Sequence, residues 1–189
     1  MTGAALLRQA ILERGRVEGD ILKVDDFLNH RVEPDLLAEI GADMAAMFPR
    51  PDVVLTAEAS GIPPGLAVAT VLGIPMIYAK KYLGPGTRHA FSREVLSTTK
   101  GVEYRVEVGR RMLPAGLDVL VIDDFLAGGR TAEALGQITA EAACSLVGMG
   151  FVVEKAFAGG RDRLEAHGWD VRALVTIESL AGGVVTLAD

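Results

Sequence analysis

The sequence has little of several residue types, and each shortage narrows what the protein can be. Among 189 residues there is one cysteine, Cys144, so no disulfide can form within the chain and we expect a cytoplasmic protein. Cys144 follows a helical pattern and precedes an apolar run, which favours a packed thiol over a nucleophile. The three histidines lack the spacing to Cys or Asp that a zinc site or a catalytic triad requires.

Long apolar runs and an excess of basic residues are also missing. No run approaches the roughly 20 apolar residues of a membrane span, and no apolar N-terminal segment resembles a signal peptide. The net charge of −6 argues against a nucleic-acid-binding protein. Apolar residues make up 50% of the chain and aromatic residues 5%. We therefore expect a single domain over residues 1–189 with an aliphatic core and no membrane or nucleic-acid partner.

Apolar runs alternate with helical patterns along most of the chain. Strands are predicted at residues 53–56, 75–79, 119–122, 147–153 and 171–177. Helices are predicted at residues 4–14, 34–48, 63–72, 130–143 and 161–167. This alternation predicts βαβ units and an α/β fold with a mainly parallel sheet flanked by helices.

Residues 80–109 depart from this alternation. Gly84-Pro85-Gly86 interrupts the chain and no core helix follows. Residues 89–98 and 103–108 predict an antiparallel hairpin that projects from the sheet. An excursion of this length between core strands is typical of an active-site lid.

The most informative stretch is residues 119–131, where an apolar strand ends in two acids, Asp123 and Asp124. The acids can hold sugar hydroxyls directly or through water on Mg²⁺, although one of them can instead cap the following helix. The next residues open a helix, and their N–H groups can wrap a phosphate. They are Ala127, Gly128, Gly129, Arg130 and Thr131. Arg130 fits phosphate pairing and a solvated first-turn position equally well.

Polar residues also follow other predicted strands, at the edge of the sheet where ligands gather. Ser60 and Gly61 form a turn that can bind pyrophosphate, although Ser60 taken alone favours a helix N-cap. Lys80 or Lys81 can neutralise pyrophosphate as it leaves, and the alternative is a pair of exposed cations.

Two further polar residues suit a nucleobase. Lys155 follows a predicted strand and can donate to a base carbonyl. The Asn29 amide can bind a carbonyl and its neighbouring N–H, although composition alone makes Asn29 a turn residue. Arg161 is expected to be a surface residue at a helix start.

Four blocks, residues 21–30, 58–62, 119–131 and 152–162, resemble a known family. The central block resembles the phosphoribosyl pyrophosphate signature of type I phosphoribosyltransferases. Together the four resemble the bacillus-type xanthine phosphoribosyltransferases. The resemblance implies a base-binding hood from about residues 1–48 and 154–189, and a lid at about 80–109. It also implies a homodimer in which an element near the strand after the pyrophosphate loop completes the neighbour's site.

The resemblance implies magnesium-dependent transfer of the 5-phosphoribosyl group from phosphoribosyl pyrophosphate to N9 of xanthine. Xanthine contacts fall on Leu22, Asn29 and Lys155. Catalytic positions are Asp123, Asp124 and Lys81, and Mg²⁺ has no direct protein ligand except through water on the two aspartates. The resemblance implies phosphoribosyl pyrophosphate contacts at Ser60, Gly61, Lys80, Ala127, Gly128, Gly129, Arg130 and Thr131.

The chain departs from this family at two places. Relatives carry Ala-Asn-Gly-Gln-Ala at residues 127–131 and Arg-Lys at residues 80–81, so which lysine meets pyrophosphate is left open. Hypoxanthine–guanine relatives carry an aspartate at the position of Ala127, and its absence argues against that specificity. Two alternatives remain: an adenine-specific transferase, and a purine-operon regulator that senses phosphoribosyl pyrophosphate. The regulator needs a winged-helix segment and a basic face.

Overall fold

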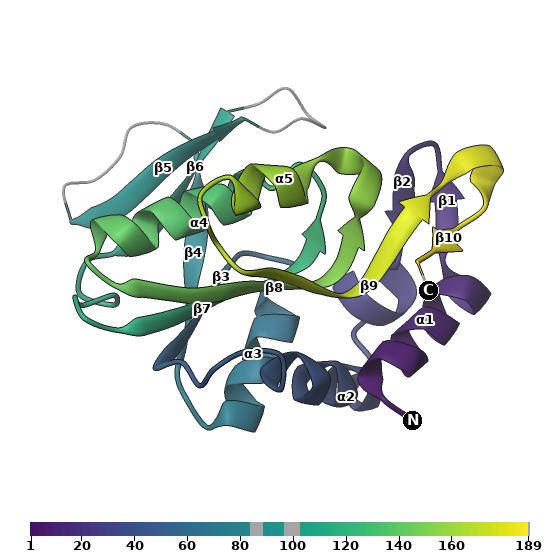
Figure 1. Cartoon of the computed structure of the whole chain (residues 1–189), viewed down its shortest axis with the longest axis horizontal. Helices are drawn as coiled ribbons and strands as arrows, with labels where there is room; N and C mark the ends of the chain where they lie inside the picture. The colour runs from purple at the N-terminus through teal and green to yellow at the C-terminus, as the bar shows by residue number, and fades with distance from the viewer. Residues whose placement is uncertain (84–88, 97–102, 189) are drawn as a thin grey trace.

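The computed structural model describes residues 1–83, 89–96 and 103–188, and its centre is an eight-stranded sheet (Figure 1). The strand order is β10-β9-β8-β7-β3-β4-β6-β5, with β3, β4, β7, β8 and β9 parallel. The strands are β3 (Val53–Ala57), β4 (Met76–Tyr82), β5 (Ala90–Leu96), β6 (Glu103–Gly109), β7 (Asp118–Leu126), β8 (Ser145–Lys155), β9 (Val171–Ser179) and β10 (Thr186–Leu187). The predicted α/β fold with a mainly parallel sheet is confirmed.

Helices cover both faces of this sheet (Figure 1). On one face lie α1 (Gly3–Arg14), α2 (Pro34–Ala45) and α3 (Ile62–Leu72); on the other lie α4 (Arg130–Glu141) and α5 (Gly160–Glu165). Strand β7 is buried on both faces because successive side chains point in opposite directions. Leu120 and Ile122 enter the core beneath α1 and α2, and Val119 and Val121 enter the core beneath α4.

The segment between α1 and α2 is short and irregular. Strands β1 (Arg16–Glu18) and β2 (Ile21–Lys23) form an antiparallel ribbon, and a π-helical turn, η1 (Asp25–Asn29), follows. The ribbon lies beside β10 and the C-terminal segment (Figure 1). The turn expected at Asn29 is present, but the sequence did not predict the ribbon. The two segments expected to form the hood are therefore neighbours in space.

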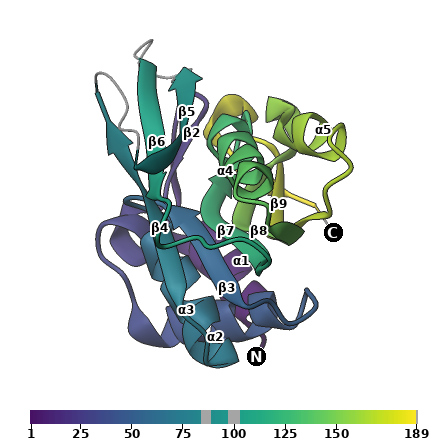
Figure 2. The ribbon, with the colours of Figure 1, turned by 90° about the vertical axis from the view of Figure 1, so that its left-hand side faces the viewer.

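The predicted hairpin is present as β5 and β6, which pair antiparallel from Ala90↔Gly109 to Leu96↔Glu103. Strand β6 also pairs with β4 at residues 80–82, so the hairpin continues the main sheet and rises beside α4 (Figure 2). The glycine–proline break at residues 84–86 and the hairpin's turn fall outside the described residues.

Strands β7 and β8 extend further than their apolar runs predicted. The runs end at Ile122 and Val153, but the ladder continues through Asp123↔Phe151, Phe125↔Val153 and Leu126↔Glu154. The acids therefore lie on the strand itself. Within the described ranges, no helix is long and apolar enough to span a bilayer.

Candidate active site

Two neighbouring carboxylates stand near the carboxyl end of β7. Asp124 is 6% exposed, and its Oδ1 accepts a hydrogen bond from Ser60 Oγ at 3.0 Å. The Asp124 N–H donates to Asp123 Oδ1, also at 3.0 Å. The N-cap of α4 is Gly129 and that of α3 is Gly61, neither with a side-chain cap bond. The capping alternatives for the aspartates and for Ser60 are therefore wrong.

The electrostatics of this pair favour a bound proton or a bound cation. Burial and the charge of Asp124 raise the pKa of Asp123 well above its usual range, and the charge of Lys81 opposes this rise. Two adjacent carboxylates ionise fully only when donors or cations compensate them. The site is suited to sugar hydroxyls and to the water of a hydrated cation.

A tightly packed turn at residues 58–61 faces these carboxylates, and its Glu58–Ala59 peptide is cis. A Cβ on Gly61 would collide with Thr56 Oγ1 and lie 2.5 Å from Asp123 Oδ1. Only glycine allows this approach between turn and strand. Within the described part of the chain, the buried Thr56 Oγ1 has no hydrogen-bond partner, and no sequence pattern pointed to it.

The predicted phosphate loop, residues 127–131, connects β7 to α4. Gly129 has a φ of 73°, which glycine adopts without steric cost, and the N-terminal N–H groups of α4 follow it. Helix α5 supports the loop from behind. Arg163 Nε donates to the Gly128 carbonyl at 2.9 Å, and a Cβ on Gly129 would lie 3.0 Å from Gly160 O. The backbone arrangement is the one that binds anions at helix N-termini.

The two lysines of β4 point to opposite faces of the sheet, as side-chain alternation requires. Lys81 lies on the carboxylate side: its backbone N–H donates to Glu58 Oε1 at 2.6 Å, and its Nζ is 5.4 Å from the Tyr104 ring centre. Lys80 instead lines a cavity of about 630 Å³ with Tyr78 and Tyr82.

Among the described residues, a contact between two hydroxyl groups joins the hairpin to the phosphate loop. The Tyr104 hydroxyl of β6 lies 2.7 Å from Thr131 Oγ1. Arg130, beside Thr131, lines a hollow of about 170 Å³ that also includes Glu94 and Glu133.

At the end of β8, Lys155 extends towards the β1–β2 ribbon. Its Nζ donates to the Asp20 carbonyl at 2.8 Å and lies 5.9 Å from the Phe125 ring centre. Burial lowers the pKa of Lys155. This contact brings the ribbon that carries Leu22 to the end of β8 that carries Lys155.

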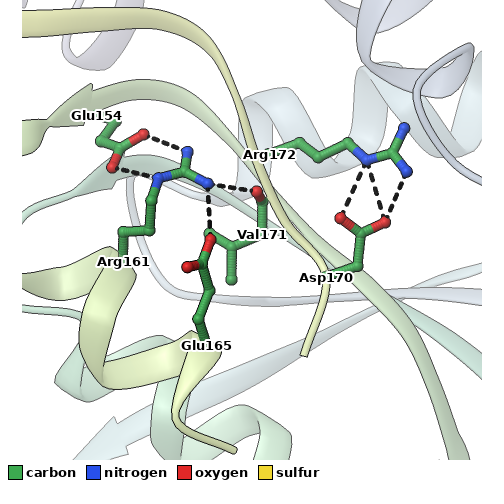
Figure 3. A network of polar contacts seen from close by, with 6 residues as sticks. All are labelled: Glu154, Arg161, Glu165, Asp170, Val171 and Arg172. Carbon is green, nitrogen blue, oxygen red and sulfur yellow. Dashed lines mark hydrogen bonds and ion pairs between the residues drawn. The ribbon is translucent and has the colours of Figure 1, made fainter. Parts of the chain in front are cut away.

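Beside Lys155, Glu154 is 2% exposed and is paired with Arg161 of α5 through two contacts of 2.9 and 2.5 Å (Figure 3). Arg161 also donates to the Val171 carbonyl at 2.7 Å. Arg161 lies at the start of α5, as expected, and its side chain is 35% exposed, but its guanidinium also neutralises the buried Glu154 carboxylate. The Arg172–Asp170 pair in the same figure is exposed.

The other two predicted base contacts differ in environment. Leu22 is 4% exposed and packs in the core with Phe27 and Val153. Asn29 ends η1, and its buried Oδ1 has no hydrogen-bond partner among the described residues. Within the same residues, no hydrogen bond joins Asn29 to Lys155 or to Leu22.

Curated relatives cover nearly the whole chain. A xanthine phosphoribosyltransferase of Pseudomonas savastanoi pv. phaseolicola is 44% identical over 184 residues, which is 95% of this chain and 97% of the relative. One of Lactobacillus delbrueckii subsp. bulgaricus has the same identity and coverage. The chain belongs to the xanthine phosphoribosyltransferase family. The resemblance seen in the sequence is thus confirmed, while no model of a known protein family matches.

Solved structures share the fold of this xanthine phosphoribosyltransferase family member. The adenine enzyme of Giardia lamblia complexed with 9-deazaadenine superposes with a TM-score of 0.76 at 19% identity, covering 95% of this chain and 99% of that chain. An adenine phosphoribosyltransferase of Rhodothermus marinus gives 0.75 at 23% identity, covering 93% and 98%. These identities show the type I phosphoribosyltransferase fold and nothing about the base.

Several contacts at the candidate site of this family member could not be predicted from its sequence. The Asp20 carbonyl is a backbone atom, and Tyr104 and Arg163 contact the phosphate loop from distant segments. Phe125 had a local signal, because it directly follows the two carboxylates on β7.

Proposed function

We propose that the protein transfers the 5-phosphoribosyl group from phosphoribosyl pyrophosphate to N9 of xanthine, giving xanthosine 5′-monophosphate and pyrophosphate. The observation that carries this proposal is its membership of a family whose named relatives cover nearly all of the chain at 41–44% identity. The carboxylate pair, the phosphate loop and Lys155 follow neighbouring strands of one sheet, which supports the same conclusion.

The proposed mechanism passes through an oxocarbenium-like transition state in which pyrophosphate departs before the purine nitrogen bonds strongly. The protein then mainly positions reactants and balances charge. Asp123 and Asp124 orient the ribose hydroxyls, and residues 127–131 hold the 5′-phosphate. Ser60, Gly61 and Lys81 hold the leaving pyrophosphate. The hairpin β5–β6 serves as the lid that keeps competing water out.

Mg²⁺ is part of the proposal and reaches the site on the substrate. Among the residues that the structure describes, no group of three or more His, Cys, Asp or Glu side chains can hold a metal. The carboxylates of Asp123 and Asp124 are hard oxygen donors suited to the water shell that Mg²⁺ retains. When bound, Mg²⁺ supplies neutralisation of the pyrophosphate charge.

Base selection is assigned to Lys155, Asn29 and Leu22. Lys155 carries donors for a carbonyl oxygen. Asn29 Oδ1, which has no hydrogen-bond partner among the described residues, can accept an N–H. The side chain of Leu22 is buried in the core and supports the β1–β2 ribbon beside the proposed base site. A base without the oxygens at C2 and C6 leaves buried donors unpaired, a loss of about 1–3 kcal/mol. Adenine lacks both oxygens and is the alternative substrate that this argument disfavours.

The function is tested by incubating the protein with Mg²⁺, phosphoribosyl pyrophosphate and one purine at a time. We expect xanthine to be preferred over guanine, hypoxanthine and adenine. A preference for adenine would overturn the base assignment. No product with any base would favour the regulator, which the acidic net charge disfavours.

The base site is tested by Lys155→Ala. Loss of the ammonium should raise the KM for xanthine about ten-fold or more, because a charged hydrogen bond contributes about 1.5–3 kcal/mol. The KM for phosphoribosyl pyrophosphate should be unchanged. Lys23→Ala, which removes a lysine with a 3.9 Å contact to Glu18, is the control. Equal loss for both substrates would contradict the role of Lys155.

We also propose a cytoplasmic homodimer, with an interface over the cavity that Lys80 lines. Exposed apolar side chains surround this cavity at Tyr78, Tyr82, Leu83 and Met112. An exposed apolar patch of this kind is typical of a protein interface. In such a dimer Lys80 points towards the neighbouring subunit. Lys81 stays beside Asp123 and Asp124 of its own subunit.

A further inference from the structure

Tyr104 lies between the two parts of the site that are proposed to hold phosphates. Its hydroxyl is 2.7 Å from Thr131 Oγ1 in the phosphate loop. Its ring centre is 5.4 Å from the ammonium of Lys81, on the pyrophosphate side. One side chain on β6 thus contacts a residue from each part.

The position of the Tyr104 ring is set by the fold. Lys81 pairs with Val106 across the β4–β6 ladder, so Lys81, Val106 and Tyr104 share one face of the sheet. The ring packs on the buried cluster that contains Val106 and, from α4, Leu135. The hydroxyl is therefore held at Thr131 by packing of the ring.

The direction of the hydrogen bond between the two hydroxyls has a functional consequence. A phenol is a stronger acid than an aliphatic alcohol and is the better donor of the two. When Tyr104 donates to Thr131 Oγ1, the hydrogen of Thr131 is free to point at an anion in the loop. Donation into Thr131 also polarises its hydroxyl and strengthens the second hydrogen bond.

We propose that Tyr104 is a positioning residue for the 5′-phosphate of phosphoribosyl pyrophosphate, acting through Thr131. This inference rests on the proposed function, since it assigns the phosphate loop to that substrate. The Tyr104 ring has a second effect, because its π face attracts the Lys81 ammonium and holds it on the carboxylate side. The hydroxyl acts on the 5′-phosphate, and the ring acts on pyrophosphate.

Two substitutions separate these effects. Tyr104→Phe removes the hydroxyl and keeps the ring, so affinity for ribose 5-phosphate should fall about five-fold, which corresponds to one hydrogen bond of about 1 kcal/mol. The KM for pyrophosphate in the reverse reaction should be unchanged. Tyr104→Leu removes both groups and should raise the KM for pyrophosphate as well.

A purely structural role for the Tyr104–Thr131 contact predicts a different result. In that case Tyr104→Phe lowers the Tm and leaves the ligand affinities unchanged. The decisive measurement is a double-mutant cycle on ribose 5-phosphate affinity by calorimetry, without any base present. Tyr104→Phe should have no further effect in a Thr131→Ala background and its full effect in a Thr131→Ser background, because serine retains the hydroxyl.

The outcomes distinguish this inference from the proposed function. If the unmodified protein makes xanthosine monophosphate but Tyr104→Phe binds ribose 5-phosphate normally, the role of Tyr104 is overturned and the function stands. If no purine is a substrate but the five-fold loss and the coupling to Thr131 are found, Tyr104 positions a phosphate and the function is wrong. Additive effects of Tyr104→Phe and Thr131→Ala overturn the role of Tyr104.

Discussion

The ionisation of Asp123 opposes folding. Burial and the charge of the adjacent Asp124 raise the pKa of Asp123. At a pH between the unfolded and the folded pKa, the folded protein therefore holds a proton that the unfolded chain has lost. The unfolded aspartate ionises near pH 4, and stability is lost as the pH rises from there through the raised pKa. This cost to stability is consistent with the binding role that we propose for Asp123.

Asp123→Asn should therefore raise the Tm and abolish activity. Asparagine retains an oxygen for the Asp124 N–H and removes the charge, so the gain over the unmodified protein should grow between pH 4 and pH 8. Thermal unfolding across this range measures it. Asp118→Asn, at the exposed start of the same strand, is the control. A variant less stable than the unmodified protein at pH 8 would contradict the argument.

At the scale of elements, the phosphate loop contains two adjacent glycines that have different roles. Gly129 has a φ of 73° and its missing side chain leaves room for Gly160 O. Gly128 has nothing within 4 Å of the position that a Cβ would occupy. The loop geometry therefore depends on Gly129, and we propose that the open space at Gly128 leaves room for the ligand.

Gly129→Ala should cost roughly 1–2 kcal/mol of stability, the penalty for a side chain in the left-handed region. It should also raise the KM for phosphoribosyl pyrophosphate, because the loop moves away from Gly160. Gly128→Ala should change stability by less than about 0.5 kcal/mol. Urea unfolding of both variants tests the contrast, and an equal loss for the two would show that φ at residue 129 is not the cause.

The long strands and helices were the elements that the sequence predicted best. Runs such as residues 147–153 are apolar throughout, because a central parallel strand is buried on both faces. The ribbon β1–β2 was missed because three residues per strand carry no measurable alternation. The extension of β7 was missed because Asp123 and Asp124 interrupt the apolar run but not the ladder.

The candidate site likewise contains some residues that the sequence predicts and others that it does not. Residues that act through local backbone geometry, such as those at 127–131, were recognisable from one continuous stretch. Contacts between segments far apart were not, since the Lys155–Asp20 contact joins residues 135 positions apart. The assignment of Lys81 rather than Lys80 to the carboxylate side needed the pairing register, which sequence alone does not define.

At the scale of the whole molecule, the two faces of the sheet around β4 carry different side chains. One carries Lys81 and Tyr104 next to the carboxylates. The other carries Lys80 and the exposed apolar residues around the 630 Å³ cavity. A subunit docked on this surface would lie directly behind the strand that holds Lys81, so we propose that assembly affects activity.

Met112→Glu should weaken the proposed dimer about 30-fold or more, the size of a hot-spot loss of about 2 kcal/mol. A two-fold interface repeats each residue, so the substitution introduces two like charges into an apolar contact. Leu66→Glu on α3 is the matched control, because Leu66 and Met112 are both 54% exposed and only Met112 lines the cavity. Sedimentation equilibrium measures the dissociation constants, and turnover assayed above and below them tests whether the monomer is active. A monomeric unmodified protein, or equal weakening by both variants, would contradict an interface at this cavity.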